Sequence, residues 1–299
     1  MDALMGSWGR GVVAALAAGI FCSAGSAQTL TVGSKNFVEQ YIVAELYAAA
    51  LEHAGFKVSR NINLGATLVV HDALRKGVID LYPEYTGTGL AVVMNAPSAG
   101  ETDAQKVHAT VKAHYEKEFK ITWLKASAVN NVNMMVVRRE TAQSMRLKTL
   151  SDLAKVARGM TLGAGPTFGD RRDGLSGLRE VYGIEFAEYR RFPAMRLRYR
   201  ALVNREIDIV AGFATDWQIA AEDLAILEDD RNLFPPYFLA PVMRMDAAAR
   251  HPKAVEVLER IGALLDNSTM QELNRQVVLG QREPRQVAGS FLKAKGVID

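Results

Sequence analysis

A short pattern that occurs once in each half of the chain most strongly constrains its fold. Residues 73–80 (ALRKGVID) and 201–208 (ALVNREID) share Ala, Leu, Ile and Asp at the same spacing. Each segment has the pattern of a helix end that runs into a strand. An aromatic residue stands five positions beyond each aspartate, Tyr85 in the first half and Phe213 in the second. The repeat predicts two similar α/β lobes that offer matched loops to one cleft, although short helix–strand junctions can also look alike by chance.

The segments around this repeat predict a doubly wound, mostly parallel sheet in each lobe. The first half alternates strands and helices, at 30–32, 38–54, 57–64, 68–76 and 78–82. The second half begins the same way, with a strand at 160–162, a turn at 163–166 and a helix at 174–182. Such β-α-β order favours ligand binding outside the carboxyl ends of the strands. Residues 240–299 show no strand pattern, so we expect them to be largely helical and to pack on the first lobe.

The length and composition of the chain are consistent with two lobes. The 299 residues exceed the roughly 100–200 of one typical domain, and a hydrophobic fraction of 49% can supply two cores. We expect a signal peptide at 1–27, a first lobe formed by 28–131 with 238–299, and a second lobe at 132–237. No long Pro/Gly-rich linker is present, so the crossings between the lobes should be short.

The N-terminal segment predicts export. Arg10 precedes an apolar run at 12–21, and small residues follow as far as Ala27. This is typical of a secretory signal peptide, and the run is shorter than the roughly 18 apolar residues of a spanning helix. A lipoprotein would be acylated at Cys22, but the bulky Phe21 before it argues against a lipid anchor. Cleavage after Ala27 would leave no thiol for disulfides, metal ligation or catalysis, in a protein that we expect to be periplasmic.

Several classes of function find no support in the sequence. The formal charge of +3 is spread over 36 basic and 33 acidic residues, a mixture that does not favour nucleic-acid binding. The five histidines lack the spacing of metal ligands. Residues 163–165 (GAG) lack the third glycine of a dinucleotide fingerprint, and no nucleophile with a base is evident. We therefore expect neither metal nor cofactor and no enzyme, with an enzyme or a sensor on the same scaffold as the alternative.

Polar and aromatic residues at the predicted strand ends form the candidate binding site. They are Lys35, Tyr85, Thr88, Arg171, Phe213 and Tyr237. Cations from both lobes could hold a carboxylate, Arg bidentately and Lys as a point charge. Ring faces could hold a cationic head group, worth about 0.5–2 kcal/mol for each ring. Taken singly, each residue could equally be a solvated charge or a packing side chain.

Two long motifs resemble the glycine betaine/choline (osmoprotectant) binding proteins of ABC importers. They are 33–40 (GSKNFVEQ) and 79–88 (IDLYPEYTGT). The resemblance continues over the mature chain, at 130–131, 171–175, 215–216, 227–230, 234–237 and 291–293. It implies a type II-like periplasmic binding protein fold, hinged closure on a small-molecule ligand, and a monomer that delivers it to a membrane permease served by an ATPase.

The same resemblance implies the roles of individual residues. Lys35, Thr88 and Arg171 match the side chains that hold the ligand carboxylate in relatives. Tyr85 and Tyr237 match two rings of the cage around the trimethylammonium group.

Two cage positions depart from the family pattern. Residues 130–133 read Asn130-Asn131-Val132-Asn133, where relatives have Asn-Asn-Thr-Tyr, and Phe213 stands where they have Tyr. Phe213 keeps a ring face, whereas Asn133 offers only hydrogen bonds. The loss of one ring should weaken quaternary-ammonium binding by about 0.5–2 kcal/mol. We expect Asn131, Asn133 and Phe213 to line the site of a betaine-like ligand, such as glycine betaine, choline or carnitine. A ligand with a non-quaternary amine, or an amino acid, is the alternative.

Overall fold

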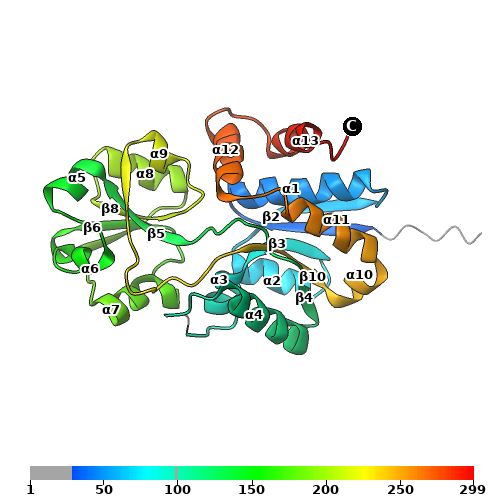
Figure 1. Ribbon diagram of the computed structural model, residues 1–299, viewed down its shortest axis with the longest axis horizontal. Helices are drawn as coiled ribbons and strands as arrows, with labels where there is room; N and C mark the ends of the chain where they lie inside the picture. Colours follow the sequence, from blue (N-terminus) through cyan, green and yellow to red (C-terminus); the bar gives the residue numbers. More distant parts are fainter. Residues whose placement is uncertain (1–28, 98–99) are drawn as a thin grey trace, which may run out of the picture.

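The computed structural model describes residues 29–97 and 100–299, and the predicted signal peptide lies outside them. Two lobes lie side by side along the longest axis (Figure 1), and each is built on a five-stranded sheet. The strand orders are β2-β1-β3-β10-β4 and β7-β6-β8-β5-β9. The predicted two-lobed α/β fold is therefore confirmed.

The first lobe combines both ends of the described chain. Its strands are β1 (Leu30–Lys35), β2 (Val58–Gly65), β3 (Leu81–Tyr85), β4 (Ile121–Trp123) and β10 (Leu239–Arg244). Its helices are α1 (Val38–His53), α2 (Thr67–Arg75), α3 (Thr86–Thr88), the π-helical turn η1 (Gly89–Val93), α4 (Ala104–Phe119), α10 (Met245–Arg250), α11 (Pro252–Gly262), α12 (Asn267–Val278) and α13 (Pro284–Ala294). Helix α1 packs against α11, α12 and α13 as well as the sheet, so it is buried on most sides.

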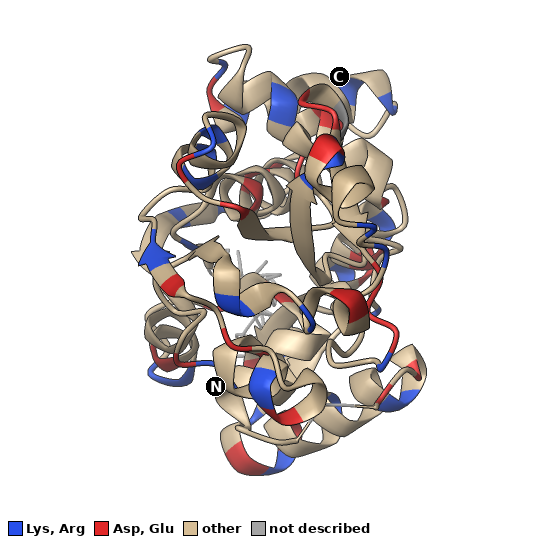
Figure 2. Cartoon of the chain, turned by 90° about the vertical axis from the view of Figure 1, so that its left-hand side faces the viewer, with Lys and Arg blue, Asp and Glu red and all other residues tan. Residues whose placement is uncertain are grey.

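The second lobe uses only the middle of the chain. Its strands are β5 (Asn133–Arg138), β6 (Thr161–Ala164), β7 (Glu188–Arg191), β8 (Ile209–Phe213) and β9 (Leu224–Leu227). Its helices are α5 (Arg139–Ser144), α6 (Leu150–Leu153), α7 (Gly177–Tyr182), α8 (Met195–Val203) and α9 (Gln218–Ala221), with short turns η2 (Ala157–Gly159) and η3 (Arg172–Ser176). Basic and acidic residues are interspersed over this end of the molecule (Figure 2), with no continuous stripe of one sign.

The repeated pattern forms the same junction in both lobes. Asp80 Oδ2 accepts a hydrogen bond from the N–H of Thr31 at 2.8 Å, and Asp208 Oδ2 accepts one from the N–H of Thr161 at 2.8 Å. The backbone N–H of each aspartate donates to the carbonyl of the same partner, at 2.8 and 3.0 Å. Each aspartate thus ties the strand that follows it to its parallel neighbour in the sheet, β3 to β1 in the first lobe and β8 to β6 in the second. The similarity of the two segments therefore extends from their sequence to their hydrogen bonds.

The C-terminal region contains a strand that the sequence did not predict. Strand β10 lies between β3 and β4 and is antiparallel to both. Residues 239–243 are buried, so β10 lacks the alternation of a half-exposed strand. Pro241 also argues against a central strand, but it lies opposite Pro83, so two residues without an N–H face each other. The expectation that 240–299 is helical was wrong for its first residues.

Two segments connect the lobes and run beside each other. One leads from β4 to β5 and the other from β9 to β10, and a bridge joins Asn130 to Phe238. The N–H of Asn131 donates to the carbonyl of Tyr237 at 3.0 Å, and the N–H of Tyr237 donates to Asn130 Oδ1 at 2.8 Å. These crossings carry predicted site residues directly between the lobes. No helix in the described part of the chain is long and apolar enough to cross a membrane.

Candidate functional site

The first lobe contributes a buried ion pair and a tyrosine ring. Lys35, the last residue of β1, forms an ion pair with Glu84 of β3, and both side chains are buried. Lys35 Nζ also lies 4.8 Å from the centre of the Tyr85 ring. Burial lowers the pKa of the Lys35 ammonium, Glu84 opposes this change, and the positive charge of Arg171 adds to it. The positive charges of Lys35 and Arg171, which come from different lobes, therefore repel each other across the site.

A second buried carboxylate, Glu39 of α1, connects the site residues. Its Oε1 accepts hydrogen bonds from the Tyr85 hydroxyl at 2.5 Å and from Asn131 Nδ2 at 2.9 Å, and its Oε2 accepts one from Asn274 Nδ2 at 2.8 Å. Asn131 Oδ1 in turn accepts from the N–H of Thr215, in the second lobe, at 3.2 Å. Glu39 thus joins the first lobe, one crossing and α12.

The second lobe contributes an arginine that is held by an acid and a tyrosine. Arg171 makes a bidentate pair with Asp173, with both N–O distances at 2.7 Å, and donates to the Tyr237 hydroxyl at 2.8 Å. Asn133 Nδ2 lies 3.4 Å from the same Asp173 carboxylate. A Cβ on Gly87 would lie 2.7 Å from atoms of the Tyr237 ring, so that ring packs directly on the turn after β3. Arg171, Asn133 and Tyr237 are therefore brought together.

Phe213 ends β8 beside Asn133 of β5, its partner in the antiparallel ladder. The guanidinium of Arg198, from α8, lies 5.3 Å from the centre of the Phe213 ring. The N–H of Phe213 and the hydroxyl of Tyr199 both donate to Asp216 Oδ2, at 2.8 and 2.7 Å. Burial raises the pKa of the Asp216 carboxyl to about 6, against the opposing effect of Arg198.

Each predicted cage ring carries one of the protein's own cations on a face. Lys35 lies over Tyr85, Arg171 lies 5.7 Å from the centre of the Tyr237 ring, and Arg198 lies over Phe213. A cation on a ring face uses the attraction that a quaternary ammonium would use. The rings are therefore parts of cation–π pairs, which the sequence did not reveal.

The structure places Thr88 differently from the other predicted residues. It is 5% exposed and ends α3, three residues beyond Tyr85, but the contacts above do not include its side chain. Three carboxylates of the site were not predicted from the sequence: Glu39, Glu84 and Asp173. All three lie inside the motifs that carry the resemblance. Each is an acidic residue close in the sequence to a predicted ligand residue, and this proximity is the signal that could have identified them.

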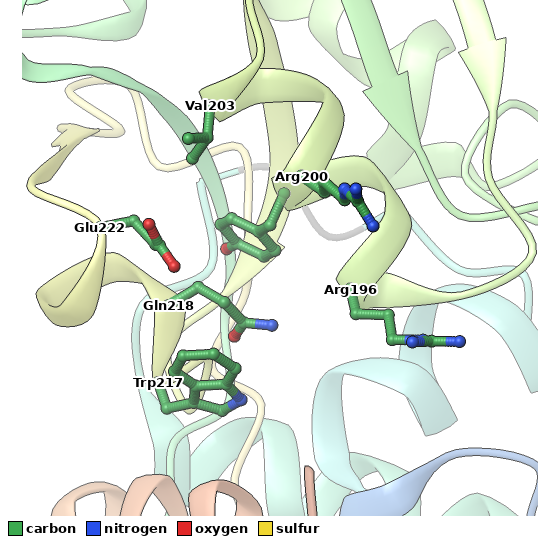
Figure 3. A pocket seen from close by; sticks show the side chains of 7 residues that line it. Arg196, Arg200, Val203, Trp217, Gln218 and Glu222 are labelled. Atoms are coloured by element: carbon green, nitrogen blue, oxygen red, sulfur yellow. The ribbon is translucent and has the colours of Figure 1, made fainter. Parts of the chain in front are cut away.

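Two cavities lie apart from this cluster. One, of about 220 Å³, lies between α8 and the segment after β8 (Figure 3) and is lined by Arg196, Tyr199, Arg200, Val203, Trp217, Gln218 and Glu222. The other, of about 500 Å³, lies between α12 and α13 and is lined by Ser268, Thr269, Glu272, Leu273, Gln276, Arg282, Val287, Ser290, Phe291 and Ala294. Neither includes a predicted site residue. No group of three His, Cys, Asp or Glu among residues 29–97 and 100–299 could hold a metal ion.

Comparison with known proteins assigns a family. Residues 28–294 match the model of the substrate binding domain of ABC-type glycine betaine transport systems. A glycine-betaine-binding protein of Pseudomonas aeruginosa is 33% identical over 94% of this chain and 93% of its own length. An ergothioneine transport permease/ergothioneine binding protein of Helicobacter pylori is 34% identical over 90% of this chain, which spans only 48% of that longer protein.

A solved structure agrees with this assignment. The crystal structure of a glycine betaine/carnitine/choline ABC transporter protein superposes with a TM-score of 0.75 and 29% identity, over 90% of this chain and 100% of the other. The chain therefore belongs to the family of substrate-binding domains of ABC-type glycine betaine transport systems.

Proposed function

We propose that this chain captures a small, carboxylate-bearing, betaine-like molecule between its lobes and delivers it to the permease of an ABC importer. One observation carries the proposal: predicted ligand residues from both lobes and both crossings lie in linked contacts. Tyr85 and Asn131 donate to Glu39, and Arg171 donates to the Tyr237 hydroxyl. The N–H of Asn131 joins the two sets by donating to the carbonyl of Tyr237.

The arrangement suits a ligand that closes the lobes. Lys35 and Arg171 bring positive charge from opposite lobes, and Tyr85, Tyr237 and Phe213 bring ring surfaces. A ligand that contacts both lobes stabilises the closed form by its differential affinity for that form. The set of groups that we place around the ligand is completed by Thr88, Asn131 and Asn133. Closure would present the permease with a surface that the open protein lacks.

The setting of this activity follows from the family and the N-terminal segment. We place the mature protein in the periplasm as a monomer without a lipid anchor, after cleavage behind Ala27. A binding domain in this position holds and releases its ligand unchanged, so we propose that it performs no catalysis. Recovery of the bound ligand unaltered after long incubation with purified protein would support this view.

Isothermal titration calorimetry tests the proposal. The mature protein should be titrated with glycine betaine, choline, carnitine, proline betaine, ergothioneine and a panel of amino acids. We expect one ligand per chain and binding by at least one carboxylate-bearing quaternary ammonium compound. Binding restricted to primary or secondary amines would favour the alternative ligand class that Asn133 suggests. No binding by any compound would contradict the proposal.

A further inference from the structure

The second lobe buries a guanidinium that forms no ion pair or hydrogen bond with the residues that the structure describes. Arg198 is 4% exposed, and its Nε is buried without an acceptor. Within residues 29–97 and 100–299 its side chain forms neither an ion pair nor a hydrogen bond. Its guanidinium lies over the face of the Phe213 ring. Buried charges in proteins are ordinarily paired, because an unpaired one loses its hydration without compensation.

The position of this guanidinium is at the ligand-binding edge of the sheet. Phe213 ends β8, and Gly165 directly follows β6, which is parallel to β8. A Cβ on Gly165 would lie 3.3 Å from Arg198 Nη1. The carboxyl ends of parallel strands are where ligands of α/β proteins bind. Arg198 therefore faces the same cleft as the predicted site residues.

The two other cations of the cleft are already neutralised. Lys35 is paired with Glu84, and Arg171 is paired bidentately with Asp173. The carboxylate near Arg198 is that of Asp216, and its Oδ2 is used by Tyr199 and by the N–H of Phe213. Among these cations, Arg198 is the one that forms no ion pair with the described residues. Asp216 attracts it electrostatically, but its buried Nε has no acceptor, so its donors are available to a ligand carboxylate.

The internal repeat shows that the fold does not require an arginine here. The alignment that pairs 73–80 with 201–208 pairs Val70 with Arg198. Val70 lies on α2, the counterpart of α8, and is fully buried in the core of the first lobe. At this helix position the first lobe has an aliphatic side chain that packs in its core, and the second lobe has a cation. A ligand gives a reason for that difference.

We propose that Arg198 binds the ligand carboxylate directly and makes the site prefer a carboxylate-bearing quaternary ammonium compound over an alcohol-bearing one. This inference rests on the proposed function and refines its site. A planar guanidinium can bind a carboxylate through two parallel hydrogen bonds. The carboxylate would then lie against Arg198 and Phe213, where the family resemblance places part of the cation cage.

Glycine betaine and choline provide a matched test, because both carry a trimethylammonium group and only glycine betaine carries a carboxylate. Wild-type protein should bind glycine betaine more tightly than choline by calorimetry. Arg198→Gln should weaken glycine betaine binding at least tenfold and leave choline binding within twofold of wild type, or tighten it. Arg198→Lys should recover part of the lost affinity as a point charge. Arg200→Gln, an exposed position on the same helix, is the control and should change neither affinity.

The outcomes separate this inference from the proposed function. If wild-type protein binds no compound of the panel, the proposed function fails. If wild-type protein prefers choline, or if Arg198→Gln changes both affinities equally or neither, the role of Arg198 is wrong and the proposed function stands. Thermal unfolding shows whether the ligand-free variants are folded. The comparison of the two ligands then separates ligand binding from a structural role, because a structural role would change both affinities.

Discussion

At the scale of single residues, Glu39 connects the predicted site residues through hydrogen bonds, and it forms no ion pair within the described part of the chain. Both of its oxygens accept hydrogen bonds, from a tyrosine hydroxyl and two asparagine amides. A buried acceptor with several donors fixes those donors in place, because each donor would lose its partner if the acceptor were removed. Glu39 therefore sets the orientation of the Tyr85 ring and of the first crossing together.

The first prediction concerns this acceptor. In Glu39→Gln, one oxygen is replaced by an NH₂ group that faces a donor, so we expect glycine betaine affinity to fall about tenfold, or about 1.4 kcal/mol. Glu45→Gln is the control, since Glu45 lies on the same helix and pairs with Arg60, outside the site contacts. It should lower the melting temperature without changing the affinity. Equal affinities for both variants, by calorimetry, would show that Glu39 does not position the site.

The second prediction concerns the altered cage position. Asn133→Tyr restores the aromatic residue that relatives have there, so the affinity for glycine betaine should rise by about two- to thirtyfold. Arg171→Ala should abolish binding, because it leaves Asp173 buried without its partner and frees Tyr237. If Asn133→Tyr has no effect while Arg171→Ala removes binding, residue 133 does not face the ligand.

The third prediction is a pH dependence. Burial raises the pKa of the Asp216 carboxyl from 3.8 to about 6, so between these values the folded protein holds a proton that the unfolded chain has lost. The free energy of unfolding contributed by this group therefore falls as pH rises from about 4 to about 6 and then stays constant. Asp216→Asn removes this dependence. Urea unfolding measures the free energy of unfolding of both proteins. Between pH 4 and pH 6, the value for the variant should rise relative to that of wild type by at most about 3 kcal/mol. A difference that does not change with pH would refute the prediction.

At the scale of secondary-structure elements, α12 bridges the lobes. It belongs to the first lobe, yet Gln271 Nε2 donates to the carbonyl of Ala214 at 2.9 Å and Asn274 Nδ2 lies 3.3 Å from the carbonyl of Thr215. Both carbonyls follow β8, next to Phe213. Helix α12 therefore contacts the loop that carries one wall of the cleft, and Figure 1 shows the helix beside the junction between the lobes.

The fourth prediction tests this bridge. Gln271→Ala removes one hydrogen bond between the lobes, so we expect the dissociation constant of any cleft ligand to rise about two- to tenfold. Gln276→Ala lies on the same helix and loses contacts to Glu272 and Arg282 instead; its dissociation constant should match that of wild type. Calorimetry on the two variants separates bridging from general destabilisation of α12, since only the first should change the affinity.

Much of the element pattern could be predicted from sequence, because periodicity and turn residues are local. Helix α1 was expected at 38–54 and ends one residue earlier. The two helix–strand junctions were recognised from four shared residues, but the strand expected at 78–82 is β3, which runs from Leu81 to Tyr85. Strand β10 was missed because its burial on both faces removes alternation. Site partners such as Glu84 and Arg198 were missed for a different reason: pairing is decided by side chains that are distant along the chain.

At the scale of the whole molecule, the two crossings are the connections between the lobes and also carry predicted ligand residues. Asn131 and Tyr237 come from different crossings, and backbone hydrogen bonds join those crossings. A change in the angle between the lobes would therefore move the side chains of Asn131 and Tyr237. This coupling is what a protein needs if ligand binding is to be signalled to a permease.

A crystal structure of the mature protein with its tightest ligand from the calorimetric panel tests the central claim most directly. The account predicts one ligand molecule between the lobes, in contact with Tyr85 from the first lobe, with Arg198 and Phe213 from the second, and with Tyr237 from a crossing. A ligand held by one lobe alone, or seated in the cavity beside Trp217, would contradict it.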